Sequence, residues 1–272
     1  MTNPTSATTT TAGEYLRSWR QHRRMSQLAF SLEAEISQRH LSFVESGRSN
    51  PSREMLMHLA ERLDVPLRER NAMLLAAGYA PVYAERPLAA PEMTAARQAI
   101  ELVLKGHEPF PALVVDRHWQ LVAHNAALAP LLTVVDATLL QPPVNVLRLS
   151  LHPQGLAPRI ANLAEWRAHL LERLRHQIAA TQDPVLAELL KELAAYPAHG
   201  TLAAIHAAPP VDHGGVLVPL SLVTDAGLMS FISTTMVFGT PRDITLSELA
   251  LEAFFPANAE TAEYMRRRGA AA

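Results

Sequence analysis

The sequence predicts two domains, an all-α domain followed by an α+β domain with one antiparallel sheet. Helical periodicity runs from Gly13 to Gly78. A linker with three prolines follows at 79–91, and short β-prone runs appear beyond it between amphipathic helices. The chain has 272 residues, which is enough for two domains, and its 49% hydrophobic content with 18% charged residues indicates a globular protein.

Five short helices are expected in the first domain, and most begin at a capping residue. Ser26, Ser37 and Ser52 are suitable N-caps for the second, third and fourth helices, and Pro66 opens the fifth. Gly47 stands where a helix commonly ends in a left-handed glycine. The expected elements are a first helix that ends near Arg24, followed by helices at 27–34, 38–46, 53–63 and 67–77.

The second domain shows a different pattern, with strands at both ends and helices between them. The expected strands are Ala112–Val115, Trp119–Ala123, Leu217–Val223, Leu228–Val237 and Thr245–Phe254. The expected helices are 92–105, 125–132, 166–180 and 184–196, and residues 133–160 are left unassigned. The turn Asp225-Ala226-Gly227 marks the clearest hairpin. We expect one antiparallel sheet with the helices gathered on one face.

Charge is distributed unevenly along the chain. The formal net charge is −2, whereas residues 13–53 carry seven arginines against four glutamates, a local net charge of +3. Such a basic face favours contact with phosphate groups, although a solvated helix surface explains the same charges. Cysteine is absent, which excludes disulfides and thiolate chemistry. No apolar run reaches the roughly 18 residues of a membrane span.

The stretch between residues 26 and 48 places two helices almost next to each other, so their relative angle must matter. Their apolar side chains are expected to face one core, and the small Ala29 is expected to let the helices approach. These apolar residues are Leu28, Leu32, Ile36, Leu41 and Val44. The join between the helices has no glycine, although a tight turn between helices often contains one.

The outer face of the helix at 38–46 is polar and suits a nucleic acid. Its side chains are Gln38, Arg39, His40, Ser42, Phe43 and Glu45. In the major groove of DNA, glutamine pairs with adenine, arginine pairs with guanine, and an aromatic ring can pack on a thymine methyl group. Free N–H groups at a helix N-terminus, such as the one capped by Ser37, can bind phosphate.

The run MSQLAFSLEAEISQRHLSFVESGRSNPS at 25–52 resembles the helix-turn-helix of the phage-repressor (XRE/Cro) class, and the likeness extends over 13–78. It implies a lambda-repressor-like fold that binds double-stranded operator DNA through a recognition helix at 38–45. It implies base contacts from Gln38, Arg39, Ser42 and Phe43, and backbone contacts from Gln27, Arg48 and Asn50. Glu45 is expected to form an ion pair with Arg20 or Arg48.

Glu35 departs from the pattern of that class, which usually has glycine at this position of the turn. A residue other than glycine must adopt a positive φ there, at a cost of about 1–2 kcal/mol. The departure affects the expected geometry of the turn and not its existence. The competing interpretation of the domain is a five-helix scaffold that binds no DNA.

Longer runs resemble the MmyB-like group of repressor-class regulators. They are QRHLSFVESGRSN at 38–50, LDVPLRERNAMLLAAGYAP at 63–81, PALVVDRHWQLVAHNAA at 111–127, LRLSLHPQGLAPRIANLAEW at 147–166 and FGTPRDITLSELALEAFFPA at 238–257. The resemblance covers nearly the whole chain. It implies a PAS-like domain at about 106–265 whose sheet curls around a small molecule, for example a fatty acid or a similar apolar acid.

The residues themselves are compatible with an apolar pocket between sheet and helices. The second hairpin strand presents Leu228, Ser230, Ile232, Thr234 and Met236 on one face and Met229, Phe231, Ser233, Thr235 and Val237 on the other. The side chains expected to close the pocket are Trp119, Trp166, Leu170 and Phe254. The alternative is a solid core that these residues fill.

If the ligand carries a carboxylate, a basic side chain is expected to meet it. The candidates lie in the covering segments and cannot be ranked: Arg148, His152, Arg159, His169 and Arg173. Asn125 is expected to cap the helix that follows the second strand.

Catalysis is not expected. The chain has twelve histidines and two polar loop clusters, Asp116-Arg117-His118 and Asp212-x-x-Gly215, so a hydrolase or a metalloenzyme is one alternative. However, it contains no HExxH motif, nucleophile elbow, phosphate loop or metal-ligand spacing. No cofactor is expected apart from a bound fatty acid or similar molecule. The second domain could also serve only for dimerisation or protein docking.

The expected organisation is a polar tail at 1–12, a helix-turn-helix domain at 13–80, a linker and connecting helix at 81–105, the PAS-like domain at 106–265 and a tail at 266–272. The first residues lack the features of a signal peptide, and we expect a cytoplasmic bacterial regulator. One short recognition helix makes few contacts, so a homodimer on a palindrome is expected, with recognition helices about 34 Å apart. Ligand binding would bias that spacing.

Overall fold

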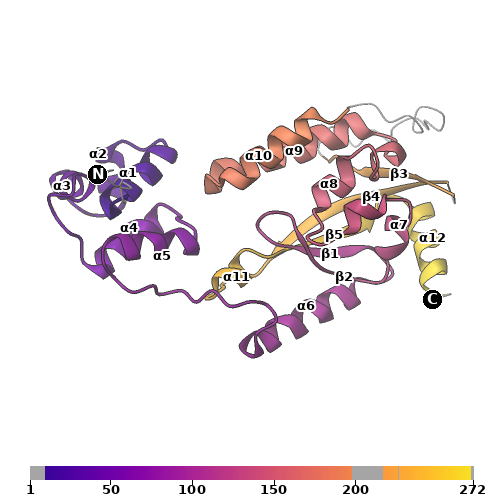
Figure 1. Ribbon diagram of the computed structural model, residues 1–272, viewed down its shortest axis with the longest axis horizontal. Helices are drawn as coiled ribbons and strands as arrows, with labels where there is room; N and C mark the ends of the chain where they lie inside the picture. The colour runs from indigo at the N-terminus through magenta and orange to yellow at the C-terminus, as the bar shows by residue number, and fades with distance from the viewer. Residues whose placement is uncertain (1–9, 198–216, 226, 271–272) are drawn as a thin grey trace, which may run out of the picture. The chain divides into compact units, whose positions relative to one another are not determined.

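The computed structural model describes residues 10–197, 217–225 and 227–270, and the chain divides into two compact units (Figure 1). Unit 1 comprises Met1–Arg86 with Arg242–Ile244, and unit 2 comprises Pro87–Pro241 with Thr245–Ala272. Unit 1 is helical and unit 2 is α+β, which confirms the predicted fold class. Residues 1–9 of the predicted tail and the loop cluster 212–215 lie outside the described residues.

Four of the five helices of unit 1 begin after the predicted residues Ser26, Ser37, Ser52 and Pro66, and the first helix begins after Thr11, which was not predicted. The helices are α1 Ala12–His22, α2 Gln27–Glu33, α3 Gln38–Glu45, α4 Arg53–Arg62 and α5 Leu67–Ala76. The side chains of Ser26, Ser37 and Ser52 each accept a hydrogen bond from a backbone N–H in the first turn of the following helix. Gly47 has a φ of 72° and ends α3, as predicted.

The helix α2 contacts the core through a face that the sequence analysis assigned wrongly. Phe30 and Ala34 are buried, whereas Leu28 and Leu32 are 54% and 71% exposed, and Ala29 is exposed as well. Both pairs have the same four-residue spacing, and in the folded domain the large ring of Phe30 and the small Ala34 are the pair that packs into the core. The prediction for Leu41 and Val44 of α3 is confirmed, since both are buried.

Unit 2 is built around a five-stranded antiparallel sheet in the described part of the chain. Its strands are β1 Ala112–Val115, β2 Leu121–His124, β3 Leu220–Thr224, β4 Gly227–Val237 and β5 Ala250–Pro256. Their order across the sheet is β2-β1-β5-β4-β3, so the last strand in sequence lies at the centre. The predicted hairpin is confirmed, with Thr224 paired to Gly227 at its turn.

The remaining elements of unit 2 are short 3-10 turns and helices. They are η1 Pro91–Met93, α6 Thr94–Gly106, α7 Ala129–Leu132, η2 Ala137–Leu140, α8 Val146–Leu151, η3 Ala157–Arg159, α9 Leu163–Thr181, α10 Pro184–Ala195, α11 Ile244–Ser247 and α12 Ala259–Ala270. The segment predicted as one strand at 245–254 is instead the end of α11 followed by β5. The helix α12 was not expected, and it runs into the predicted tail at 266–272. No helix of the described residues is long and apolar enough to cross a membrane.

The sheet is covered on both faces, so the expectation that all helices lie on one face is wrong (Figure 1). Along β1 the side chains alternate: Leu113 and Val115 join the larger core with α8 and α9, while Ala112 and Val114 join a smaller core with α6. All four residues of β1 are buried. A short continuous apolar run is typical of a strand that is covered on two sides, and the larger core contains the cavity described below.

Candidate functional site

The recognition-type helix α3 is fixed in unit 1 by a buried ion pair. Arg20 of α1 donates from Nε and Nη2 to the two carboxylate oxygens of Glu45, at 2.6 and 2.8 Å. It also donates from Nη1 to the carbonyl oxygen of Met25, at 2.8 Å. One guanidinium group therefore connects α1, the loop before α2 and the end of α3. The predicted pairing of Glu45 with Arg20 is confirmed.

Glu45 is a charged group inside the protein, since its side chain is 0% exposed. Burial on its own would raise the pKa of Glu45, but hydrogen bonds from Arg20 and Gln27, together with the charges of Arg20 and Arg17, hold that pKa below its ordinary value. The carboxylate therefore stays ionised at neutral pH, which keeps the ion pair with Arg20 intact.

A close contact between α1 and α3 adds to this constraint. A Cβ atom placed on Gly13 would lie 2.3 Å from the carbonyl oxygen of Val44. Only glycine allows the two backbones to approach so closely. The end of α3 thus has little freedom to move relative to α1.

The turn between α2 and α3 has the geometry that the missing glycine suggested. Glu35 has a φ of 55°, in the left-handed region. The N–H of the following Ile36 donates to the carbonyl oxygen of Ser31 at 2.9 Å, which closes the end of α2. The positive φ predicted for Glu35 is confirmed.

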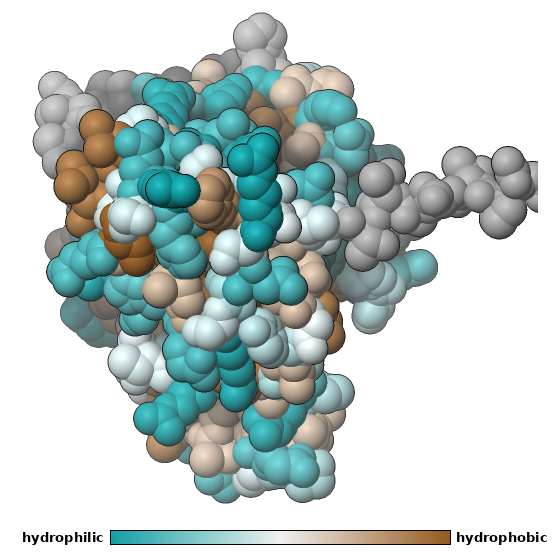
Figure 2. Space-filling view, turned by 90° about the vertical axis from the view of Figure 1, so that its left-hand side faces the viewer, coloured by the Kyte–Doolittle hydropathy of each residue, from teal (hydrophilic) through white to brown (hydrophobic). Residues whose placement is uncertain are grey.

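The exposed face of α3 carries the predicted base-reading side chains. Gln38 and Arg39 are exposed, and Ser42 and Phe43 are half-buried. The Arg39 guanidinium lies 5.4 Å from the centre of the Phe43 ring, which orients both groups. Figure 2 turns the left-hand side of Figure 1 toward the viewer, and hydrophilic side chains predominate there, with hydrophobic side chains gathered at the upper left.

The predicted backbone-contacting residues lie around the ends of α2 and α3. Gln27 donates from Nε2 to Glu45 at 2.8 Å, so its amide is held beside α3. The Ser37 hydroxyl accepts from the N–H of His40 at 3.1 Å. Arg48 and Asn50 are exposed in the loop after α3. Amide, hydroxyl and guanidinium groups in this arrangement can bind phosphates on either side of a groove.

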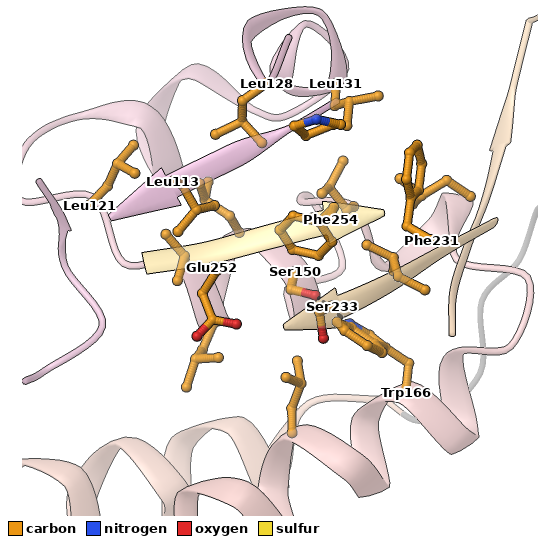
Figure 3. A pocket seen from close by; sticks show the side chains of 18 of the residues that line it. Leu113, Leu121, Leu128, Leu131, Ser150, Trp166, Phe231, Ser233, Glu252 and Phe254 are labelled. Atoms are coloured by element: carbon orange, nitrogen blue, oxygen red, sulfur yellow. Dashed lines mark hydrogen bonds between the residues drawn. The ribbon is translucent and has the colours of Figure 1, made fainter. Parts of the chain in front are cut away.

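Unit 2 contains an apolar cavity of about 90 Å³ between the sheet and the helices α8 and α9. A single water needs roughly 10–15 Å³ of such volume, so the cavity is larger than an ordinary packing defect. Seven of the predicted ligand-binding residues line it: Trp119, Trp166, Leu170, Arg173, Phe231, Ser233 and Phe254. In Figure 3, Leu128 and Leu131 lie on one side of the cavity, and Ser150, Ser233 and Glu252 lie on the other.

An ion pair forms the polar side of the cavity. Arg173 of α9 donates from Nη1 to Glu252 of β5 at 2.9 Å, and its Nη2 donates to the other oxygen of the same carboxylate. Its Nη2 also donates to the Thr235 hydroxyl at 2.6 Å. The Glu252 side chain is 5% exposed. The charge of Arg173 is therefore already compensated within the protein.

Trp119 enters the cavity from a strained turn instead of from a strand. It has a φ of 64°, and β2 begins only at Leu121, so the predicted strand 119–123 starts two residues too early. The Asp116 side chain shapes the turn by accepting from the N–H groups of His118 and Gln120, at 2.8 and 2.9 Å. The guanidinium of Arg173 lies 4.6 Å from the centre of the Trp119 ring.

The other predicted ligand-binding residues lie outside this cavity. Arg148 pairs with Glu192 at 2.7 Å, and the His152 ring packs edge-on against Tyr196. His169 packs against Trp166, and burial together with the charge of Arg173 lowers the pKa of His169. Arg159 lines a separate surface hollow. Thr235 contacts the ion pair of Arg173 but does not line the cavity.

Several lining residues were not predicted, chiefly the leucines and Glu252. The leucines that the sequence analysis did not name include Leu113, Leu121, Leu128, Leu131, Leu147, Leu149, Leu156, Leu220 and Leu222. Most come from the strands β1, β2 and β3 or from the unassigned region 133–160. The alternation of β5 gives one usable signal, since Glu252 must share a face with the predicted Phe254.

Asn125 has a different role from the predicted helix cap. Its side-chain oxygen accepts from the N–H of Ala112 at 3.0 Å, and its amide nitrogen donates to the carbonyl oxygens of Leu104 and Phe110. The helix α7 begins four residues later, too far for capping by Asn125. Asn125 therefore joins α6 to the start of β1.

Comparisons with known proteins agree with this arrangement. Residues 16–70 match the helix-turn-helix family model, and residues 96–267 match the model of the MmyB-like transcription regulator ligand binding domain. No curated protein matches the chain. Since the second match alone covers more than half of the sequence, the chain belongs to the MmyB-like family of transcription regulators, with a DNA-binding helix-turn-helix domain and a ligand-binding domain.

Proposed function

We propose that the cavity of unit 2 binds a small apolar ligand, such as a fatty acid, and that ligand occupancy modulates operator binding by unit 1. The observation that carries this proposal is the cavity itself, which has a volume of about 90 Å³ and is lined mainly by apolar side chains. Protein interiors are normally close-packed, and an empty apolar space lowers stability. A ligand that fills it recovers the lost contacts.

The regulator acts on DNA as a homodimer in this proposal, because one short helix makes too few base contacts for a specific site. Two copies would place their α3 helices about 34 Å apart on a palindrome. A ligand that changes operator affinity 5- to 150-fold needs a coupling free energy of about 1–3 kcal/mol. The proposal assigns the protein to the bacterial cytoplasm and gives it no catalytic activity and no other cofactor.

The direct test is native mass spectrometry of the protein purified from cells. A small adduct that persists in the folded protein and is released on denaturation supports the proposal, and extraction then identifies the ligand. A protein that carries no adduct, and that takes up neither a fatty acid nor a neutral analogue after delipidation, contradicts it.

A pair of variants links that ligand to the cavity. Ser233→Leu adds apolar volume to the lining of the cavity, and we expect it to lose both the adduct and the effect of ligand on promoter DNA retardation. Thr234→Leu adds a similar side chain at the exposed neighbouring position on the other face of β4, and it should bind ligand as the wild type does. Equal ligand binding by both variants would place the ligand elsewhere.

The main alternative is that unit 2 serves only for dimerisation or protein docking. It predicts a filled core and DNA binding that does not respond to any ligand. The cavity favours the ligand-binding proposal, since a module used only for docking has no need for open space in its core.

A further inference from the structure

A surface hollow lies beside the cavity of unit 2 and shares a wall with it. The hollow has a volume of about 160 Å³ and is formed by α7, η3, the end of β3 and α12. Three leucines, Leu131, Leu156 and Leu222, line both spaces. These side chains therefore form a thin apolar partition between the cavity and the surface. We call the hollow the basic groove, after Arg159 and Arg268 in its lining.

The basic groove carries positive charge that the protein compensates only weakly. Arg159 lies 3.6 Å from Asp225, whose side chain is fully exposed, so solvent screens this pair. Arg268 donates from Nη1 to the Tyr264 hydroxyl at 3.0 Å, and it pairs with no carboxylate among the described residues. Two guanidinium groups and one exposed carboxylate thus line the basic groove, and an anion can be accommodated there.

In the ion pair at the other side of the cavity, the positive charge is fully compensated by the protein. Both Arg173 and Glu252 are satisfied by the bidentate contact between them, and Glu252 is 4% exposed. An anion that displaced Glu252 from Arg173 would leave a buried carboxylate without a partner, which is strongly unfavourable. An anionic group therefore finds a better site in the basic groove than beside Arg173.

The basic groove is also held in place by the backbone. The N–H of Ala161 donates to the carbonyl oxygen of Ser221 at 2.8 Å, and Ile160 forms a bridge with Leu222. These contacts fix Arg159 of η3 against β3. Binding there needs little ordering of the chain, which favours affinity.

We propose that the basic groove binds the anionic head group of a single-chain amphiphile, whose apolar chain passes between Leu131, Leu156 and Leu222 into the cavity. The inference rests on the proposed ligand-binding function and adds the ligand class, its orientation and its route of entry. The three residues of the partition are leucines, and a change of leucine rotamer can open a passage from the basic groove to the cavity.

The test is isothermal titration calorimetry of the delipidated full-length protein with dodecanoate and with dodecan-1-ol, which share a chain and differ in charge. The variant Arg159→Gln with Arg268→Gln removes both guanidinium groups of the basic groove. We expect it to bind dodecanoate about tenfold more weakly than the wild type, as for the loss of a charge-assisted hydrogen bond, and to bind dodecan-1-ol equally well. Unchanged binding of the alcohol shows that the cavity of the variant is intact.

Arg267→Gln is the matched control, since Arg267 lies next to Arg268 on α12 and pairs with Glu263 instead. It should leave the binding of both ligands unchanged. If the double variant binds dodecanoate as tightly as the wild type, the inference is overturned while the proposed function stands. Selective loss of dodecanoate binding in Arg173→Gln alone would also overturn it, because the head group would then lie beside Arg173. If the wild type binds neither ligand, the proposed function itself fails.

Discussion

Glu35 illustrates how a single residue can keep a turn at some cost in stability. With a φ of 55°, it occupies the left-handed region in which a side chain other than glycine is strained by about 1–2 kcal/mol. Because the larger flexibility of glycine in the unfolded chain offsets part of that strain, we expect Glu35→Gly to raise the free energy of unfolding by about 0.5–1 kcal/mol. Urea denaturation measures this change, and operator specificity should not alter.

The control for this prediction is Glu33→Gly, two residues earlier in α2. It removes the same charge, but it places glycine at the last residue of α2, which should lower the free energy of unfolding by up to about 1 kcal/mol. A loss of stability in both variants would mean that the side chain of Glu35 makes a contribution that outweighs its strain.

Glu45 should make the stability of unit 1 depend on pH in the acid range. Its pKa is lower in the folded protein than the ordinary value of 4.5, so the unfolded state binds a proton first as the pH falls. Its contribution is complete above the ordinary value and is lost as the pH falls through the lower folded value. Urea denaturation of wild type and Glu45→Gln should therefore give a difference that is large at neutral pH and shrinks below about pH 4. The exposed Glu33→Gln serves as the control for replacing a carboxylate by an amide on the surface of unit 1.

At the level of elements, the contacts of Gly13, Arg20 and Glu45 hold α3 in a fixed position relative to α1. We expect Gln38→Ala with Arg39→Ala to abolish sequence-specific retardation of promoter DNA, since two base-pairing side chains worth about 1–3 kcal/mol each are lost. Non-specific binding at low salt should remain. The control is Arg62→Ala at the end of α4, which also removes an exposed arginine from unit 1. Specific retardation by the double variant would show that α3 is not the recognition helix.

Most helices and strands could be predicted from local signals in the sequence. Which face of a helix packs against the core could not always be predicted in this way. Capping serines and the hairpin turn depend on neighbouring residues, and these predictions are confirmed. The phase of α2 depends on competition between the Leu28–Leu32 and Phe30–Ala34 stripes, which only tertiary packing decides. Similarly, Arg148 could be named as a candidate, but its partner Glu192 lies 44 residues further along the chain. No local sequence pattern shows that the charge of Arg148 is already compensated by this carboxylate.

For the whole molecule, the important feature is that the two units have separate cores. The core of unit 1 is formed by residues between Ala12 and Tyr79, and the cavity lies in the core of unit 2. A ligand that binds only the folded form of unit 2 stabilises that unit. At a free concentration of one hundred times Kd, the expected stabilisation is about 2.7 kcal/mol.

Differential scanning calorimetry of the full chain with and without dodecanoate tests this expectation. Two transitions are expected, and ligand should raise the temperature of only one of them. The Ser233→Leu variant serves as the control, since its filled cavity should make both transitions insensitive to ligand. A single transition that the ligand shifts as a whole would show that the units unfold together.

The positions of the tryptophan side chains make the intrinsic fluorescence of the protein sensitive to whether its cavity is occupied. Two of its three tryptophans, Trp119 and Trp166, line the cavity, while Trp19 is 4% exposed in the other core. Tryptophan emission shifts to shorter wavelength when water leaves the ring, and a nearby cation such as Arg173 changes its intensity. The arrival of a ligand should therefore be visible in the intrinsic fluorescence, without any added dye and against a constant background from Trp19.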